Sequence, residues 1–197
     1  MNAYRTSAAI ALGILCLAPG CDGCGRRRAP RSVREAKRLA SLGTGDNKQK
    51  FGEFVKEQGF DGLKRIIERA DEDHMAARLV AISGLGMLAD DPKATQFLIQ
   101  LCDGEDPELA HWAVIALAHQ GAPEAKDAIA RLIKSPDPER RAGACLAIKE
   151  YGDESLHPLL DAALDDPDSQ VKLAAQMAKR LILEGQVVGG NPDGGTE

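Results

Sequence analysis

The sequence predicts an all-α fold in which pairs of helices stack along the chain as a solenoid. A segment of similar pattern recurs in the second half and is clearest at residues 107–121 and 138–152, each of which runs from a proline to a glycine. Another apolar segment of helical character precedes each copy, and Asp-Pro dipeptides separate the two. A repeat of about 30 residues is typical of units that bury a core only against their neighbours.

Each copy of the recurring segment has the pattern of a helix with a defined start and end. Residues 73–86 and 168–181 align with the two clear copies, although the last copy has a leucine in place of the glycine. Three columns are apolar in every copy: Leu79, Val114, Cys145 and Ala174; Val80, Ile115, Leu146 and Ala175; Ile82, Leu117, Ile148 and Met177. Their spacing places an apolar stripe along one side of a helix. Proline suits the first turn of that helix, and glycine suits the position after its last turn.

A second helix is expected before each copy, at residues 62–69, 94–102, 125–134 and 155–164. The joints between the helices of a pair include Asp106-Pro107, Asp137-Pro138 and Asp166-Pro167. Because the residue before a proline avoids helical geometry, these dipeptides mark turns. The pattern therefore predicts a helix, a tight turn and a second helix, repeated about four times.

Residues 137–148 read Asp-Pro-Glu-Arg-Arg-Ala-Gly-Ala-Cys-Leu-Ala-Ile and resemble the short bacterial, phycobilin-lyase-like repeats of the HEAT-repeat family. Where an arginine is usual in these repeats, the other copies have Gln170, Ala110 and Met75. The resemblance covers residues 59–184 and implies a right-handed α-α superhelix of about four helix pairs. Residues 32–58, with helices at 33–42 and 48–57, are expected to form an N-terminal helical cap. The resemblance implies no particular activity, because solenoids serve many partners.

Residues 1–20 have the pattern of an export signal peptide. Arg5 precedes an apolar run at residues 8–18, which is too short to span a bilayer and suits the core of a signal peptide. Residues 17–21, Leu-Ala-Pro-Gly-Cys, resemble the lipobox of bacterial lipoproteins, which implies cleavage and acylation of Cys21. We therefore expect a membrane-anchored lipoprotein of the cell envelope, on its periplasmic or extracellular side. Plain secretion and an uncleaved anchor are the alternatives.

The spacing of Cys21 and Cys24 could also indicate redox chemistry, a metal-binding pair or haem attachment. Gly25 stands where haem attachment requires a histidine, and no second cysteine pair completes a zinc site. We therefore interpret the pair as a lipid-bearing cysteine beside a thiol without a special role. Cys102 and Cys145 fall at apolar helical positions, where a buried thiol behaves as a small hydrophobic group.

The residues that follow Cys21 are strongly basic. Arg26, Arg27, Arg28 and Arg31 lie in the segment 21–31, which we expect to contact anionic lipid headgroups as a tether once Cys21 is acylated. A solvated linker that leads into the first helix is the alternative. At the other end of the chain, residues 185–197 are rich in glycine and lack periodicity, which predicts a disordered tail.

The charge balance excludes one class of function. Without residues 1–20, which contain Arg5 and no acid, 24 basic residues stand against 30 acidic ones, a formal charge of −6. The chain therefore lacks the basic excess of a generic nucleic-acid binder. No catalytic, metal or cofactor site is predicted, because the sequence has no phosphate loop or nucleophile elbow, and its histidines form no metal-binding motif. We expect a protein that is not an enzyme.

A partner-binding face is predicted on the side of the recurring helices that lies opposite the apolar columns. Its rows are mostly small and include the only tryptophan: Ala77, Trp112, Gly143 and Lys172; Ala81, Ala116, Ala147 and Gln176; Gly84, His119, Glu150 and Lys179. In HEAT-like solenoids the second helix of each pair lines the concave surface, so we expect Trp112, His119, Arg140 and Lys172 to contact a protein partner there. Alternatively, Trp112 fills a gap between helices, and the small residues permit tight curvature.

Together these observations predict a membrane-tethered, envelope-facing adaptor that binds a protein partner on its concave surface. One alternative is a lyase-like or chaperone-like helper that binds a small ligand or cofactor in the groove, which the repeat resemblance alone suggests. Another alternative is a structural spacer without a specific partner.

Overall fold

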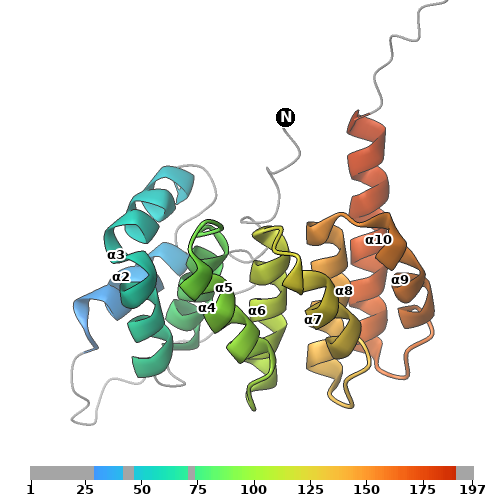
Figure 1. Ribbon diagram of the computed structural model, residues 1–197, viewed down its shortest axis with the longest axis horizontal. Coiled ribbons are helices and arrows are strands. Elements are labelled where there is room, and N and C mark those ends of the chain that lie inside the picture. Colours follow the sequence, from blue (N-terminus) through green and yellow to red (C-terminus); the bar gives the residue numbers. More distant parts are fainter. Residues whose placement is uncertain (1–28, 42–46, 71–73, 190–197) are drawn as a thin grey trace, which may run out of the picture. The chain divides into compact units, whose positions relative to one another are not determined.

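The computed structural model describes residues 29–41, 47–70 and 74–189, and every regular element in these ranges is a helix (Figure 1). This confirms the predicted all-α solenoid fold. The chain divides into two compact units, an N-terminal unit up to Gln100 and a C-terminal unit from Leu101 onward. The predicted signal peptide, Cys21 and Arg26, Arg27 and Arg28 lie outside the described residues.

The N-terminal unit contains α2 (Arg31–Ser41), α3 (Asn47–Arg69), α4 (Met75–Gly86) and most of α5 (Pro92–Cys102). Both α2 and α3 pack against α4. The largest fully buried side chains of this unit are Leu63, Ile66, Ile82, Leu85, Leu98 and Val33. Helix α3 is broken at Gly59, whose φ of 55° and ψ of −173° are accessible in practice only to glycine. The break lies between the segment expected as the end of the cap and the first helix of the repeats.

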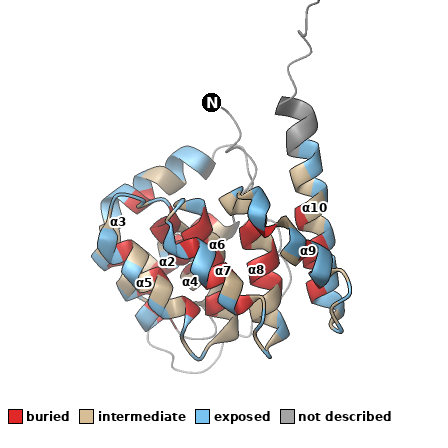
Figure 2. Cartoon of the chain, turned by 45° about the vertical axis from the view of Figure 1, so that its right-hand side comes forward, coloured by how far each residue is buried: buried red, intermediate tan, exposed pale blue. Residues whose placement is uncertain are grey.

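The C-terminal unit contains α6 (Pro107–His119), α7 (Glu124–Leu132), α8 (Pro138–Tyr151), η2 (Glu154–Leu156), α9 (His157–Ala163) and α10 (Ser169–Gly189). Helix α10 continues to Gly189 and therefore past residue 184, where the repeats were expected to end. Its buried residues lie in the first half of the helix (Figure 2). The remainder of the predicted disordered tail, residues 190–197, lies outside the described residues.

Two of the three Asp-Pro joints start helices, whereas α10 begins only at Ser169 and is capped by Asp168 instead of Asp166. The side-chain carboxylate of Asp106 accepts hydrogen bonds from the backbone N–H groups of Glu108 and Leu109, at 3.0 and 3.1 Å. Asp137 caps α8 in the same way, and in both helices the following proline occupies the first turn. Such a cap is worth about 1 kcal/mol because it satisfies N–H groups that have no partner within the helix. At the other end of α8, Gly152 adopts the left-handed conformation with φ 74°.

Within the C-terminal unit, the second helices of the pairs form the more closely packed layer. Helix α8 packs extensively against both α6 and α10, whereas α7 and α9 have no comparable contact with each other. Small residues make this approach possible: a Cβ atom added to Gly143 would lie 2.7 Å from the Cα of His111. Because successive repeats are closest on the side of α6, α8 and α10, this is the inner side of the unit.

This packing corrects the expectation that the rows of small residues line an open groove. Ala77, Ala81, Ala116, Ala147 and Gly143 are all buried. In the N-terminal unit, a Cβ atom added to Gly84 would likewise come within 3.0 Å of Val55 and 3.2 Å of Leu63. Neighbouring helices therefore cover the small residues, and only the larger members of these rows reach the surface.

Candidate functional site

A stripe of accessible residues runs along α6. Glu108, Trp112, Ile115 and His119 are spaced by four, three and four residues, and each is half-buried or exposed, whereas residues 109–111, 113–114 and 116–118 are buried. This spacing places the four side chains on one face of the helix. Trp112 and Ile115 are therefore apolar side chains that only partly reach the core.

Helix α8 continues the same surface 31 residues later. Leu146 occupies the position equivalent to Ile115 and is also half-buried. His119 and Glu150 occupy equivalent positions, and their Nδ1 and Oε2 atoms lie 3.9 Å apart, while Glu150 also pairs with Lys149 at 2.9 Å. The two helices thus form one continuous strip, which we call the Trp112 surface: Trp112, Ile115, His119, Leu146, Lys149 and Glu150. At its edge His119 is exposed, whereas the paired side chains of Lys149 and Glu150 are only 16% and 11% exposed.

The buried His111 lies against Trp112 and fixes its position. His111 is only 8% exposed. Its Nδ1 lies 2.7 Å from Oε1 of Glu139 on α8 and 3.1 Å from the backbone oxygen of the same residue. Both neighbours are acceptors, so Nδ1 carries the proton and donates. The ring centroids of His111 and Trp112 are 5.2 Å apart and tilted by 42°. The hydrogen bond from His111 also holds the pKa of Glu139 below its ordinary value, against the opposing effect of desolvation.

The other candidate contacts lie elsewhere. Arg140 uses its guanidinium to donate to the backbone oxygen of Cys102 at 3.2 Å and to that of Gly104. It therefore ties α8 to the end of α5, which is a structural task that the sequence pattern did not reveal. Lys172 is exposed on α10. Because Asp106, Asp137 and Asp168 cap α6, α8 and α10 in the same way, the position on α10 that is equivalent to Trp112 is the buried Ala174, not Lys172. The structure thus places Trp112 and His119 on one helix face, Lys172 farther along the layer, and Arg140 at a repeat junction.

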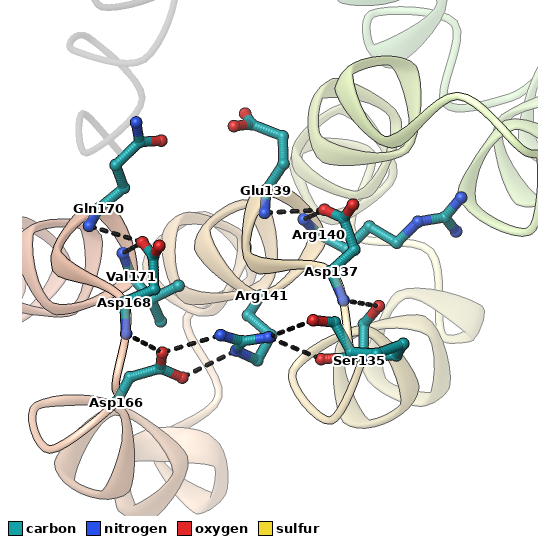
Figure 3. A network of polar contacts seen from close by, with 10 residues as sticks. Ser135, Asp137, Glu139, Arg140, Arg141, Asp166, Asp168, Gln170 and Val171 are labelled. Atoms are coloured by element: carbon teal, nitrogen blue, oxygen red, sulfur yellow. Dashed lines mark hydrogen bonds and ion pairs between the residues drawn. The ribbon is translucent and has the colours of Figure 1, made fainter.

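A second polar network connects α8 to the following repeat (Figure 3). Arg141 binds Asp166 through two hydrogen bonds, Nε to Oδ2 at 2.8 Å and Nη2 to Oδ1 at 2.9 Å. Its Nη1 donates to the backbone oxygens of Ser135 and Pro136, at 2.9 and 3.0 Å. The Arg141 hydrogen bond is the main reason why the pKa of Asp166 is lowered and that of Arg141 raised.

This network makes adjacent repeats a rigid platform for the Trp112 surface. The side chains of Arg141 and Asp166 are only 14% and 11% exposed, and Asp166 also accepts a hydrogen bond from the backbone N–H of Asp168 at 2.9 Å. Sequence reasoning recognised the Asp-Pro turns but did not assign a partner to Arg141. The signal available in the sequence was the Asp166-Pro167 pair, which follows Arg141 about one repeat later.

The described residues offer little reactive chemistry. Burial raises the pKa of the Cys102 and Cys145 thiols to about 12, so both stay protonated and are poor nucleophiles at neutral pH. Within the described ranges there is no group of three or more His, Cys, Asp or Glu side chains that could hold a metal ion. In the same part of the chain, no helix combines the length and apolar character needed to cross a membrane.

Stacked helix pairs with a closely packed inner layer define an α-solenoid, a class of protein that typically serves as a non-enzymatic interaction scaffold. Residues 95–179 match the family model of HEAT repeats. This stretch extends from α5 into α10 and supports a HEAT-repeat assignment for it. A search of curated proteins finds no match.

Proposed function

We propose that this protein is a membrane-tethered, envelope-facing adaptor that binds a protein partner through the Trp112 surface. The observation that carries the binding part is the strip of half-buried Trp112, Ile115 and Leu146 on two helices locked together by His111 and Glu139. A tryptophan held in place before binding loses little conformational freedom in a complex, so it suits an interface anchor. Helical repeats present such surfaces to partners as a common mode of action.

Membrane attachment is supported by the sequence of the N-terminal segment. The lipobox-like residues 17–21 end at Cys21, and Arg26, Arg27, Arg28 and Arg31 follow. Basic residues directly after an acyl chain add electrostatic attraction to an anionic bilayer and so strengthen an anchor that one chain alone supplies only weakly. The tether would place the solenoid at the envelope surface. Intact-mass measurement of the protein from its native host tests this part, because acylation at Cys21 changes the mass by a defined amount.

A protein partner fits the geometry better than an enclosed small ligand. A ligand site built around Trp112 and His119 would bury both side chains on several sides. His119 is instead exposed, and its imidazole lies beside the carboxylate of Glu150 at the margin of the strip. An open strip with an apolar centre is accessible to another protein.

Site-specific photocrosslinking in the native host tests the partner-binding part. A photoreactive phenylalanine analogue at Ile115 should yield a defined protein adduct, identified by mass spectrometry. The matched control carries the analogue at Met87, which is 44% exposed and lies on the N-terminal unit. Adducts that are identical at both positions, or no adduct at Ile115, would contradict the proposal. Trp112→Ala should abolish the adduct while circular dichroism shows unchanged helicity.

A further inference from the structure

Helix α2 presents a basic face that the Trp112 surface does not involve. Arg31, Arg34 and Lys37 are exposed, as is Arg38, while Glu35 is the only acidic residue of the helix. The opposite side of α2 carries Val33, Ala36 and Leu39, which are buried. Because that side packs onto α3 and α4, the basic side chains necessarily point away from the core.

The positive charges of Arg31, Arg34 and Lys37 are available for an external anion. No ion pair among the described residues uses Arg31, Arg34 or Lys37. In contrast, exposed cations of the C-terminal unit such as Lys126 and Arg131 pair with the carboxylates of Asp153 and Asp103. Three such charges on one helical face favour a polyanionic surface over a single small anion.

The charge of the chain as a whole is unevenly divided. Residues 1–58 contain eleven Lys and Arg against five Asp and Glu, whereas residues 59–197 contain fourteen against twenty-five. An anionic surface would therefore attract the region around α2 and repel the remaining repeats. Such an arrangement orients a protein as well as attracting it.

We propose that the basic face of α2, formed by Arg31, Arg34 and Lys37, binds the anionic surface of a lipid bilayer. It extends the basic run of residues 26–28 into the folded domain, so that a rigid helix and not only the segment before it contacts the headgroups. The inference rests on the membrane placement in the proposed function, but it depends neither on acylation of Cys21 nor on a protein partner. Contact through α2 restricts the orientation of the N-terminal unit at the membrane.

Vesicle co-sedimentation of the full chain carrying Cys21→Ser tests the inference, because this background lacks the acylation site. We would compare vesicles of phosphatidylcholine alone with vesicles that also contain phosphatidylglycerol, whose anionic headgroups give the surface a negative potential that attracts basic residues. Each basic side chain near such a surface raises partitioning about fivefold. R31Q/R34Q/K37Q should therefore reduce the binding gained from phosphatidylglycerol at least tenfold, roughly allowing for screening by salt. The phosphatidylcholine arm subtracts any apolar contribution of residues 1–20.

The matched control is R65Q/K93Q/K134Q, which removes the same charge from three other exposed positions. It should bind phosphatidylglycerol vesicles as the parent does, and circular dichroism should show both triple variants folded. Equal losses in the two variants would indicate a response to net charge alone and would overturn the inference. Retention on nucleic acid without any preference for anionic vesicles would also overturn it. If vesicle binding fails while the Ile115 adduct persists, the partner-binding proposal stands and only this inference falls.

Discussion

Arg141 forms two hydrogen bonds to Asp166 of the next repeat and two to the joint before its own helix, so replacing it with alanine should destabilise the C-terminal unit without altering the Trp112 surface directly. The substitution leaves the Asp166 carboxylate, which is only 11% exposed, without its cation. It also leaves the backbone oxygens of Ser135 and Pro136 without the Nη1 donor that binds both. These acceptor oxygens then lack a hydrogen-bond donor, except where water reaches them.

The expected magnitude follows from this partial burial. Removing one member of a fully buried ion pair costs about 3–5 kcal/mol, whereas an exposed pair is worth about 0–1 kcal/mol. The Arg141–Asp166 pair lies nearer the buried limit, but the bond to Pro136 is exposed. We therefore expect Arg141→Ala to lower the free energy of unfolding by about 2–3 kcal/mol. Arg141→Lys should recover less than half of this loss, because an ammonium cannot form the two parallel bonds to Asp166.

Urea unfolding followed by circular dichroism measures this loss. Arg180→Ala is the matched control, because the Arg180 side chain is 68% exposed and pairs only with Glu184 one turn away; it should cost less than about 0.5 kcal/mol. A double-mutant cycle with Asp166→Ala should give a coupling energy of at least about 1 kcal/mol. Additive effects, or a loss for Arg141→Ala no larger than the control, would refute the argument that this pair holds the repeats together.

Three further predictions concern acid stability, packing and thiol access. The pKa of Asp166 is lowered in the folded state. Its contribution to the free energy of unfolding is therefore complete above about pH 4, the ordinary carboxyl value, and disappears as the pH falls through the lower folded-state pKa. Arg141→Ala should flatten this acid dependence in urea titrations. Gly143→Ala should lower the free energy of unfolding by about 1–3 kcal/mol, because the added Cβ would meet the backbone of His111. The control Gly52→Ala adds a Cβ with nothing within 4 Å and should be neutral or stabilising. Equal melting temperatures of the two variants would contradict this prediction. With the other three cysteines replaced by serine, Cys102 and Cys145 should react with a thiol reagent only as urea opens the fold, and rapid native labelling would show that they are not buried.

The helix pairs and the starts of α6 and α8 were predictable because local chemistry sets them. Asp106 and Asp137 cap their helices with their own side chains, and the prolines after them suit a first turn, so each signal lies within a few residues of its effect. The first apolar column was predictable for the same reason, since a 3.6-residue period reports which side of a helix faces the core: Leu79, Val114, Cys145 and Ala174 are all buried. The other two columns were predicted only in part. Ile115 and Leu146 of the second and Met177 of the third are half-buried, and Ile115 and Leu146 belong to the Trp112 surface, which was expected on the opposite side.

The candidate site was predictable only in part, because it depends on which helix approaches which. Sequence alone could not show that Gly143 faces the backbone of His111, or that the Arg140 guanidinium is used at the end of α5. The rows of small residues therefore suggested an open groove, whereas in the folded chain neighbouring helices pack against them.

The sequence by itself determined the repeat, its helix starts and ends, the apolar stripe, and the segments that suggest export and lipid attachment. These properties arise from residues close together in the chain, whose capping and periodicity act locally. The tertiary structure decided that α6, α8 and α10 form the inner layer, that Arg141 and Asp166 lock successive repeats, and that α2 turns its basic side outward. Those outcomes depend on contacts between residues about thirty positions apart, and only the packing of one helix against another selects them.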